Sequence, residues 1–412
     1  MIKVKATNTN FTALDIGSSK VSILAADISP IGDARIGYQS ISHSSGIRAG
    51  EIFDFKQAEN SIINAIYNLE KSIDKRINNV SISLSGMGCK SLYIYQKIRL
   101  IEGKVSKNDI KTLISKGLER FEDSSVSVLH YFPIEYTLDQ NNSINNPLGM
   151  YGNVLGCRIH VVLADSLQVS NLISCFAKCH ISVKEIVVGS YASSLAVLTE
   201  DEKSLGSVLI DFGSSTTSYS IFSGGQLIFT GFIPYGGNHI TSDIAKVLSI
   251  SMQSAEKLKV MYGSALSSSD NDNMINLSEF EHGANFDYES SISPTDLSMI
   301  INARVEEIIE ILKSEYDKLG VDHLIGRRIV LTGGGSSLRG IKEVVSTNFK
   351  KQVRIGSPVI IPGFDSDHTI QSYTSVLGLV KNEMVKLKKS SPFSESSTGL
   401  IQKISSWFKE GI

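Results

Sequence analysis

The sequence predicts an α/β protein made of two duplicated halves around a cleft, with a small inserted subdomain and a C-terminal amphipathic helix. The first observation is a repeat: residues 14–19 read LDIGSS and residues 210–215 read IDFGSS. The second is that each copy lies between two runs of alternating apolar residues, which is typical of a β-hairpin. A pattern that recurs about half a chain apart indicates two related halves.

The composition fits an ordinary globular protein. A length of 412 residues predicts two to three domains at roughly 150 residues each. Hydrophobic residues make up 42% and charged residues 20%, which excludes wholesale disorder and fibrous repeats. The 40 Lys and Arg residues nearly balance the 42 Asp and Glu residues, so the formal charge is −2. We therefore expect no nucleic-acid partner recruited by the net field of the protein.

The cysteines and the apolar segments indicate where the protein resides. Four scattered cysteines are too few for a disulfide framework, which favours a reducing cytoplasm. No apolar segment follows the first lysines as in a signal peptide, and no window reaches the length of about 18 apolar residues that a spanning helix needs. We expect a protein that is neither exported nor transmembrane.

The first half is predicted to begin with a β-hairpin of residues 11–16 and 20–28, joined by a glycine turn. Apolar residues at helical spacing then predict a helix over residues 58–77. Over residues 85–165 the pattern changes to short strands around one helix at residues 106–121. This change of pattern indicates an inserted subdomain.

The second half is predicted to follow a helix near residues 166–179 and to open with a hairpin over residues 207–222. Residues 264–293 are poor in aliphatic side chains and should form surface loops and short strands. A long amphipathic helix is predicted over residues 294–319, where Ser-Pro-Thr-Asp provides a start signal. Another strand and a glycine turn follow at residues 329–335.

The tail has a composition of its own. Residues 390–398 are rich in serine and predict a flexible linker. Residues 399–412 predict an amphipathic helix, because five apolar side chains fall on one face: Leu400, Ile401, Ile404, Trp407 and Phe408. An aromatic pair beside Lys403 and Lys409 is typical of a helix that lies in a membrane interface. The alternative is a helix that packs back on the domain.

The two repeated turns suit phosphate binding, since glycine lets the backbone approach closely and N–H and hydroxyl groups donate to phosphate oxygens. Asp15 and Asp211, one from each turn, are candidates to hold a hydrated Mg²⁺. Lys20 is a candidate to neutralise a terminal phosphate. A single such turn is more often an ordinary hairpin, but the duplication favours a binding site.

Three further polar segments extend this candidate site. The glycine turn at residues 333–335 lies between an apolar strand and a predicted helix, where backbone amides can contact a phosphate or a sugar. Residues 234–238 read PYGGN and form another polar turn. Glu256 and Lys259 share one helical face at i, i+3 spacing, which fits either a binding site or an exposed ion pair.

Together these motifs resemble those of the actin, hexokinase and DnaK-chaperone superfamily, and within it those of the FtsA family of bacterial cell-division proteins. The resemblance covers nearly the whole chain and includes all three glycine turns. More specific to the FtsA family are residues 193–202 (SSLAVLTEDE), residues 233–245 (IPYGGNHITSDIA) and the position of the insertion after Ser85. The resemblance implies an actin-like fold of two RNase H-like halves around a nucleotide cleft that binds ATP and Mg²⁺.

The resemblance also implies the residues of the site. ATP phosphate and Mg²⁺ would be bound by residues of three turns: Asp15, Gly17, Ser18, Ser19, Lys20, Asp211, Gly213, Ser214, Ser215, Thr216, Gly236, Gly237 and Asn238. The adenosine would be held by Glu256, Lys259, Gly333, Gly334 and Gly335. The metal would be bound through water at Asp15 and Asp211.

The resemblance divides the chain into two halves and four smaller parts. The first half would comprise residues 1–84 and 166–205, closed by a helix at 370–389, and the second half residues 206–240 and 312–369. Residues 85–165 would form the inserted subdomain, which corresponds to subdomain 1C of the family. Residues 241–311 would form a second small lobe like subdomain 2B, followed by the linker (390–398) and the amphipathic helix (399–412).

The function implied is that of an ATP-binding protein that polymerises on the inner face of the cytoplasmic membrane at the division septum. It would anchor the FtsZ ring through its C-terminal helix and help recruit later division proteins. Expected partners are a second copy of the chain, anionic lipid, the FtsZ C-terminal tail, and later division proteins that bind residues 85–165. Arg304 lies where the family has a basic residue that meets the acidic FtsZ tail.

One departure from the superfamily concerns hydrolysis. The second turn usually reads Asp-x-Gly-Gly-Gly-Thr-x-Asp, whereas here Ser214 and Ser215 replace glycines and Ser218 replaces the later acid. A left-handed backbone at either replaced glycine would cost about 1 kcal/mol or more. We therefore expect a reshaped turn, or hydroxyl groups in place of lost amide contacts, and at most slow ATP hydrolysis.

Two other functions are compatible with this fold class. A small-molecule kinase or phosphotransferase would use ATP as a substrate and would need a carboxylate base in the cleft, which no motif supplies clearly. A chaperone would need a separate peptide-binding domain, for which too few residues follow the last predicted core helix.

Overall fold

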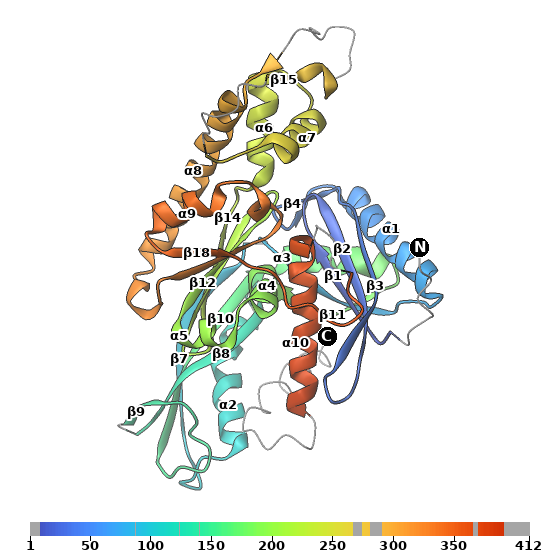
Figure 1. Ribbon diagram of the computed structural model, residues 1–412. Coiled ribbons are helices and arrows are strands. Elements are labelled where there is room, and N and C mark those ends of the chain that lie inside the picture. The colour runs from blue at the N-terminus through green and yellow to red at the C-terminus, as the bar shows by residue number, and fades with distance from the viewer. Residues whose placement is uncertain are drawn as a thin grey trace.

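The computed structural model describes residues 9–86, 88–122, 124–139, 141–266, 274–280, 291–365 and 370–390. Two five-stranded sheets lie on either side of two central helices, and a four-stranded sheet extends from one end of the molecule (Figure 1). A small helical lobe, which contains α6 (Gly237–Leu248) and α7 (Met252–Tyr262), lies at the opposite end (Figure 1).

The first sheet has the strand order β11-β6-β1-β2-β3. Its strands are β1 (Phe11–Ile16), β2 (Lys20–Ile28), β3 (Ala34–His43), β6 (Asn79–Leu84) and β11 (Ser182–Val188). The first three are antiparallel neighbours, whereas β6 runs parallel to both β1 and β11, so the predicted first hairpin is confirmed. A short hairpin of β4 (Ile47–Arg48) and β5 (Glu51–Ile52) precedes the covering helices α1 (Phe55–Ile73) and α3 (Ser166–Lys178).

The second sheet repeats this topology with the order β14-β13-β12-β17-β18. Its strands are β12 (Ser207–Phe212), β13 (Thr217–Ser223), β14 (Gln226–Ile233), β17 (Arg328–Thr332) and β18 (Gln352–Ile355). Again three antiparallel strands are followed by two parallel ones. The duplication predicted from two short motifs therefore extends over both sheets.

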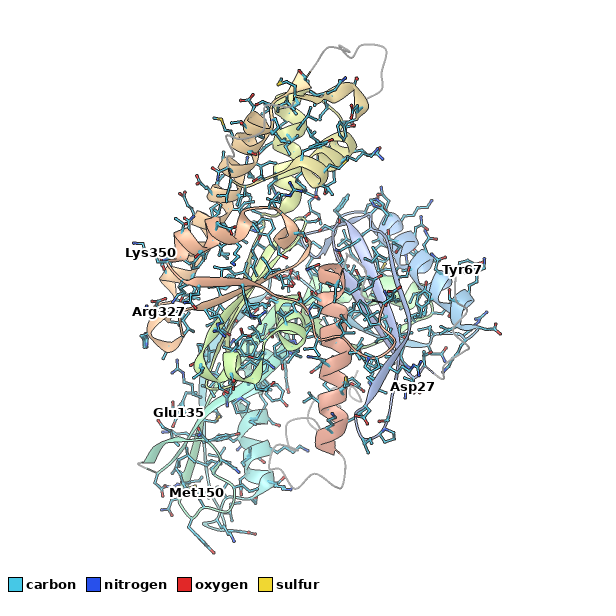
Figure 2. The ribbon with its side chains drawn as sticks, in the orientation of Figure 1. Asp27, Tyr67, Glu135, Met150, Arg327 and Lys350 are labelled. Atoms are coloured by element: carbon cyan, nitrogen blue, oxygen red, sulfur yellow. The ribbon has the colours of Figure 1, made fainter. Side chains whose placement is uncertain are left out.

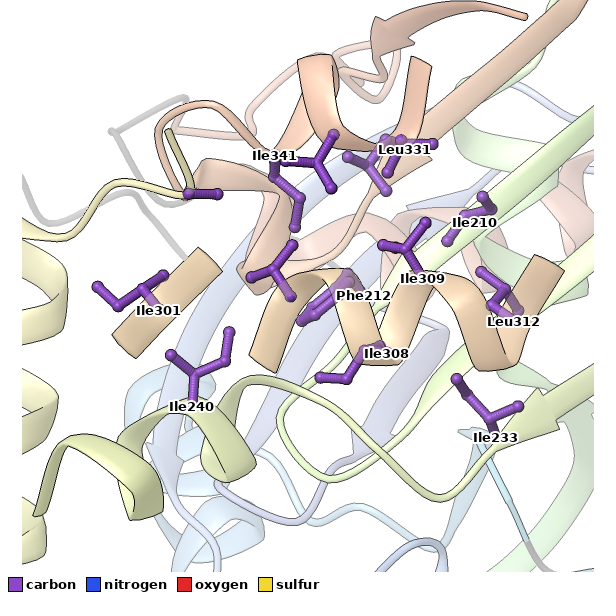
Figure 3. Close-up of a cluster of buried hydrophobic side chains, with 14 of the residues drawn as sticks. Ile210, Phe212, Ile233, Ile240, Ile301, Ile308, Ile309, Leu312, Leu331 and Ile341 are labelled. Atoms are coloured by element: carbon purple, nitrogen blue, oxygen red, sulfur yellow. The ribbon is translucent and has the colours of Figure 1, made fainter. Parts of the chain in front are cut away.

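The helices of the second half are α6 (Gly237–Leu248), α7 (Met252–Tyr262), α8 (Pro294–Lys318) and α9 (Ile341–Phe349), and the small lobe also contains the strands β15 (Ile275–Asn276) and β16 (Ser291–Ile292). The predicted long helix begins as expected, because Ser293 accepts a hydrogen bond from the Asp296 amide and proline occupies the first turn. Its apolar face, with Ile301, Ile308, Ile309 and Leu312, belongs to a buried cluster. The same cluster includes Ile240 of α6, Leu331 of β17 and Ile341 of α9 (Figure 3). The boundary predicted at residue 312 falls inside this single continuous helix.

The predicted helix over residues 58–77 is shifted in the structure, where α1 spans Phe55–Ile73. Asp54 caps its start by accepting a hydrogen bond from the Gln57 amide. The helix ends where Asp74 adopts a left-handed conformation with φ 51°. Ile77 lies in the following loop but is also buried, so the apolar pattern extends past the end of the helix.

The inserted subdomain is a four-stranded sheet with the order β7-β10-β8-β9, covered by α2 (Lys107–Leu118). The prediction of short strands was wrong: β7 (Lys90–Arg99), β8 (Val126–Leu138) and β10 (Val154–Asp165) have 10, 13 and 12 residues, and only β9 (Asn141–Ile144) is short. Glu135 and Met150 are labelled on this subdomain, and Met150 lies further from the rest of the molecule (Figure 2).

The inserted subdomain is also joined to the edge strand β14 of the second half. The Ser91 hydroxyl donates to the Thr230 carbonyl (2.8 Å) and accepts from the Thr230 amide (2.9 Å). His160 Nδ1 lies 3.0 Å from the Leu227 carbonyl oxygen, and Tyr93 donates to the Ile228 carbonyl. The subdomain therefore contacts both halves. It is inserted into the chain of the first half, and these hydrogen bonds join it to the second half.

Helices α4 (Gly189–Val197) and α10 (Thr374–Ser390) cross at the junction of the two halves. Their approach is so close that a Cβ atom at Gly378 would lie 1.8 Å from the Ala192 carbonyl oxygen. The predicted closing helix at 370–389 is thus α10 together with the short 3-10 turn before it.

A buried ion pair ties α5 (Glu200–Leu205) to β18. Arg354 donates to both carboxylate oxygens of Glu202, at 2.7 and 2.6 Å, and the Glu202 side chain is only 3% exposed. Burial alone would raise the pKa of Glu202, but hydrogen bonds from Arg354 and from the Thr199 amide hold it at about 2. The carboxylate is therefore charged and paired at neutral pH.

Replacing Arg354 by methionine is expected to lower the free energy of unfolding at pH 7 by about 3 kcal/mol, because the buried Glu202 carboxylate loses both Arg354 hydrogen bonds and keeps the more distant Arg328, at 3.5 Å, as its cationic partner. The pKa of Glu202 is depressed on folding, so its stabilising contribution is present above its ordinary value of 4.5 and is lost as the pH falls through about 2. Denaturant unfolding at several pH values should show that the difference in unfolding free energy between the wild type and the variant shrinks as the pH falls from 4.5 to about 2. A constant difference at every pH would contradict this explanation.

Candidate functional site

The two sheets enclose a cavity of about 950 Å³ at the ends of the two hairpins. All predicted phosphate- and adenosine-binding residues except Gly236 line it. The cavity therefore brings together three glycine turns that are separated by more than half of the chain. Further lining residues that sequence reasoning missed are His43, Ser85, Arg339, Gln371, Ser372 and Ser375.

The two hairpin turns have the same geometry. In each turn the glycine amide donates to a carbonyl three residues later, from Gly17 to Lys20 at 3.0 Å and from Gly213 to Thr216 at 2.9 Å. Neither Ser214 nor Ser215 adopts a positive φ, so the serines that replace glycines cause no backbone strain. The backbone cost expected for a left-handed serine therefore does not arise in this turn.

The turn before α6 supports the second hairpin turn from outside. The Gly237 amide donates to the Gly213 carbonyl (3.0 Å), and the Asn238 amide donates to the Ser214 carbonyl (2.7 Å). A Cβ atom at Gly236 would lie 2.6 Å from the Gly213 carbonyl oxygen, so the close approach requires glycine there. Gly237 and Asn238 line the cavity, whereas Gly236 acts through this packing.

Asp15 and Asp211 are buried carboxylates at the base of the cavity. The pKa of Asp15 is raised to about 6: burial is the main cause, the negative charge of Asp211 adds to the rise, and a hydrogen bond from Ser83 and the charge of Lys20 oppose it. Burial likewise raises the pKa of Asp211 and lowers that of Lys20. Two buried carboxylates that face one cavity, with one cation beside them, fit a site for a divalent cation.

A buried hydroxyl group also points to a ligand. Ser214 Oγ is shielded from solvent and has no hydrogen-bond partner among the residues that the structure describes. Buried polar groups are nearly always paired, so an unpaired hydroxyl in a phosphate-binding type of turn fits an absent acceptor. The donor set of this turn therefore suits an anionic ligand.

The other end of the cavity carries the predicted pair Glu256 and Lys259 on α7. Their side chains form an ion pair of 2.7 Å, and Lys259 Nζ also donates to the Thr241 hydroxyl (2.8 Å) and the Gly237 carbonyl (3.2 Å). These contacts fix the lysine between α6 and α7. The pair is part of the cavity wall rather than an isolated surface ion pair.

Gly333 closes the cavity next to Asp211. Its φ is +85°, and a Cβ atom would lie 2.3 Å from Asp211 Oδ1 and 2.7 Å from the Phe212 carbonyl oxygen. Any side chain here would push the third glycine turn away from the second hairpin.

Two groups of predicted residues are not part of the described lining of this cavity. Arg304 on α8 is one-quarter exposed and forms ion pairs with Asp243 of α6 and with Glu307. The predicted membrane-binding residues, Leu400, Ile401, Lys403, Ile404, Trp407, Phe408 and Lys409, lie outside the described residues, as does most of the linker. Within the described ranges, which end at residue 390, no helix is long and apolar enough to cross a membrane.

Sheet topology and cleft define the class of protein: the fold is that of the actin-like ATPases. The chain resembles the solved PilM–PilN type IV pilus biogenesis complex with a TM-score of 0.65 and 15% identity, over 92% of this chain and 99% of that one. It also resembles MreB5 of Spiroplasma citri bound to ADP, with a TM-score of 0.55 and 14% identity, over 92% and 97% of the two chains.

A family model described as "Cell division protein FtsA" matches residues 208–378, and one described as "SHS2 domain inserted in FTSA" matches residues 86–163. The cell division protein FtsA of Agrobacterium fabrum is 31% identical over 97% of this chain and 94% of its own length. That of Escherichia coli is 28% identical over 92% and 91% of the two chains. The chain belongs to the FtsA family of cell division proteins.

Proposed function

We propose that the cavity binds ATP with Mg²⁺ and that the protein uses the bound nucleotide to polymerise. The observation that carries this proposal is that two largely buried carboxylates, Asp15 and Asp211, line one cavity together with Lys20 and interact electrostatically with it. The two hairpin turns would bind the phosphates, and the Glu256–Lys259 pair and residues 333–335 the adenosine. A bound Mg²⁺ would be held through water by Asp15 and Asp211 and would offset their negative charges and those of the phosphates.

The cavity wall favours nucleotide binding over rapid phosphoryl transfer. The acidic residues among the described lining are Asp15, Asp211 and Glu256. Glu256 is paired with Lys259, and the other two are the proposed cation ligands. A kinase or fast ATPase would need a further group to accept a proton from the attacking oxygen; Ser218 replaces the acid of the superfamily pattern, and His43 is the remaining candidate base on the described wall. We therefore propose at most slow ATP hydrolysis.

Isothermal titration tests nucleotide binding. The wild-type chain is expected to bind ATP more tightly with Mg²⁺ than with EDTA, and Asp211→Asn should reduce the affinity in Mg²⁺ by at least about tenfold. The same substitution should not lower the melting temperature of the nucleotide-free protein, because it removes one of two buried like charges. Unchanged affinity in a folded variant would show that Asp211 takes no part in binding.

We further propose that the chain tethers the FtsZ ring to the cytoplasmic face of the membrane at the septum. The C-terminal amphipathic helix would bind anionic lipid, the α6–α8 lobe would bind the FtsZ tail, and residues 85–165 would contact later division proteins and neighbouring subunits. Membership of the FtsA family supports this assignment. The proposed division of the chain follows the same family pattern, and the matched SHS2 segment coincides with the inserted sheet.

Arg304→Glu is expected to weaken binding of a peptide with the sequence of the FtsZ C-terminal tail by about tenfold. An acidic peptide would compete with Asp243 and Glu307 for this guanidinium, and reversing the charge turns the contact into a repulsion. Fluorescence anisotropy with a labelled peptide measures the change. The control is Lys318→Glu, which reverses an exposed charge near the far end of the same helix and should leave binding unchanged. Equal loss in both variants would contradict a local role for Arg304.

A further inference from the structure

Each of the two cleft carboxylates receives a short hydrogen bond from a serine that was not among the predicted site residues. Ser83 Oγ donates to Asp15 Oδ1 at 2.5 Å, and Ser193 Oγ donates to Asp211 Oδ2 at 2.6 Å. Both serines are fully buried. A hydroxyl group at this distance from a carboxylate fixes the orientation of the carboxylate as well as stabilising its charge.

The two serines come from different places in the duplicated fold. Ser83 is the register partner of Asp15 on the adjacent parallel strand β6, so this support lies within the first sheet. The corresponding partner of Asp211 on β17 is Thr332. Thr332 does not take the role of Ser83, because its hydroxyl lies 3.2 Å from that of Thr374 on α10.

Asp211 is instead held from the junction between the halves. Ser193 lies on α4, which directly follows β11 of the first sheet, and its hydroxyl is also 3.0 Å from that of Ser375 on α10. The close packing of α4 on α10 at Gly378 leaves Ser193 little freedom to move. The orientation of Asp211 on the second sheet therefore depends on the position of that sheet relative to α4. The orientation of Asp15 does not, because Ser83 lies in the same sheet as Asp15.

We propose that Ser193 is a positioning residue for Asp211, and that through it the junction helices α4 and α10 set the geometry of the cation site. This inference rests on the proposed binding of ATP with Mg²⁺. Without the Ser193 hydroxyl, Asp211 keeps its charge but loses its fixed orientation toward the cavity. Binding of ATP alone would be little affected, whereas the additional affinity supplied by Mg²⁺ would fall.

The test compares ATP affinity in Mg²⁺ and in EDTA for the wild type, Ser193→Ala and Ser194→Ala. Ser194 is a matched control on the same helix, buried like Ser193, whose hydroxyl donates to the Tyr191 carbonyl (2.6 Å) and has no carboxylate partner in the part of the chain that the structure describes. Ser193→Ala is expected to reduce the Mg²⁺-dependent gain in affinity by about tenfold and leave the affinity in EDTA unchanged. Ser194→Ala is expected to leave both values unchanged.

Three outcomes would overturn the inference in distinguishable ways. If the wild type does not bind ATP, the proposed function fails and this inference fails with it. If the wild type gains affinity from Mg²⁺ and Ser193→Ala keeps the full gain, only the positioning role fails. If Ser193→Ala and Ser194→Ala lose affinity equally in both conditions, the effect is a packing defect of α4, and thermal melting of the nucleotide-free variants should then show the same loss of stability in both.

Discussion

Gly333→Ala is expected to reduce ATP affinity about a hundredfold, the largest effect that we predict for a single methyl group. A left-handed alanine costs about 1–2 kcal/mol, and overpacking typically adds about 1–3 kcal/mol. The added Cβ would overlap both Asp211 Oδ1 and the Phe212 carbonyl oxygen, so the third glycine turn must move away from the cleft. Isothermal titration with ATP and Mg²⁺ measures the loss.

Gly320 provides a matched control for this substitution. Its φ is +63°, but a Cβ atom there would meet no other atom within 4 Å. Gly320→Ala therefore carries the backbone penalty without the overlap, and it should lower stability slightly while leaving ATP affinity unchanged. A folded Gly333→Ala protein that binds ATP as tightly as Gly320→Ala would contradict the proposed place of this turn in the site.

A chain that ends at Ser390 is expected to lose vesicle binding almost completely. The predicted helix would bury five apolar side chains at about 1.5–3 kcal/mol each, offset by about 1 kcal/mol or more for each residue that becomes ordered. One helix would therefore bind weakly, and a polymer would bind tightly because neighbouring helices raise each other's effective concentration. Co-sedimentation of the intact chain with anionic vesicles and ATP–Mg²⁺ should rise steeply with protein concentration.

The point variants Trp407→Glu and Trp407→Phe separate the helix from other consequences of truncation. Glutamate should place a charge on the apolar face and abolish co-sedimentation, whereas phenylalanine should retain most of it. If the truncated chain and Trp407→Glu still pellet with vesicles as the intact chain does, the membrane contact lies elsewhere on the molecule.

The sequence was sufficient to predict the hairpins and the residues that gather in the cleft. The repeated turn motif and the alternating strands are local signals, and the structure places both turns at one cavity. The end of α1 was not predictable in this way, because Ile77 continues the apolar pattern after Asp74 has ended the helix. The strands of the inserted subdomain were also longer than predicted.

The serines that hold the two carboxylates required the structure. Ser83 is 68 residues from Asp15, and its role depends on the parallel register of β6 with β1. Ser193 is only 18 residues from Asp211, but it reaches the carboxylate from a helix rather than from the adjacent strand. Serines at such positions look like ordinary small core residues until the pairing of the strands is known. The pairing of Arg354 with Glu202 is hidden in the same way, because the two residues are 152 positions apart.

Recruitment of FtsZ to vesicles tests the proposed function most directly. Anionic vesicles, the intact chain, ATP–Mg²⁺ and its cognate FtsZ are mixed and centrifuged, and FtsZ is measured in the pellet. FtsZ is expected to pellet with vesicles only when the intact chain is present, and to stay in the supernatant with Arg304→Glu or with the chain ending at Ser390. The proposed tethering of FtsZ is contradicted if the intact chain is bound to the vesicles and FtsZ nevertheless stays in the supernatant.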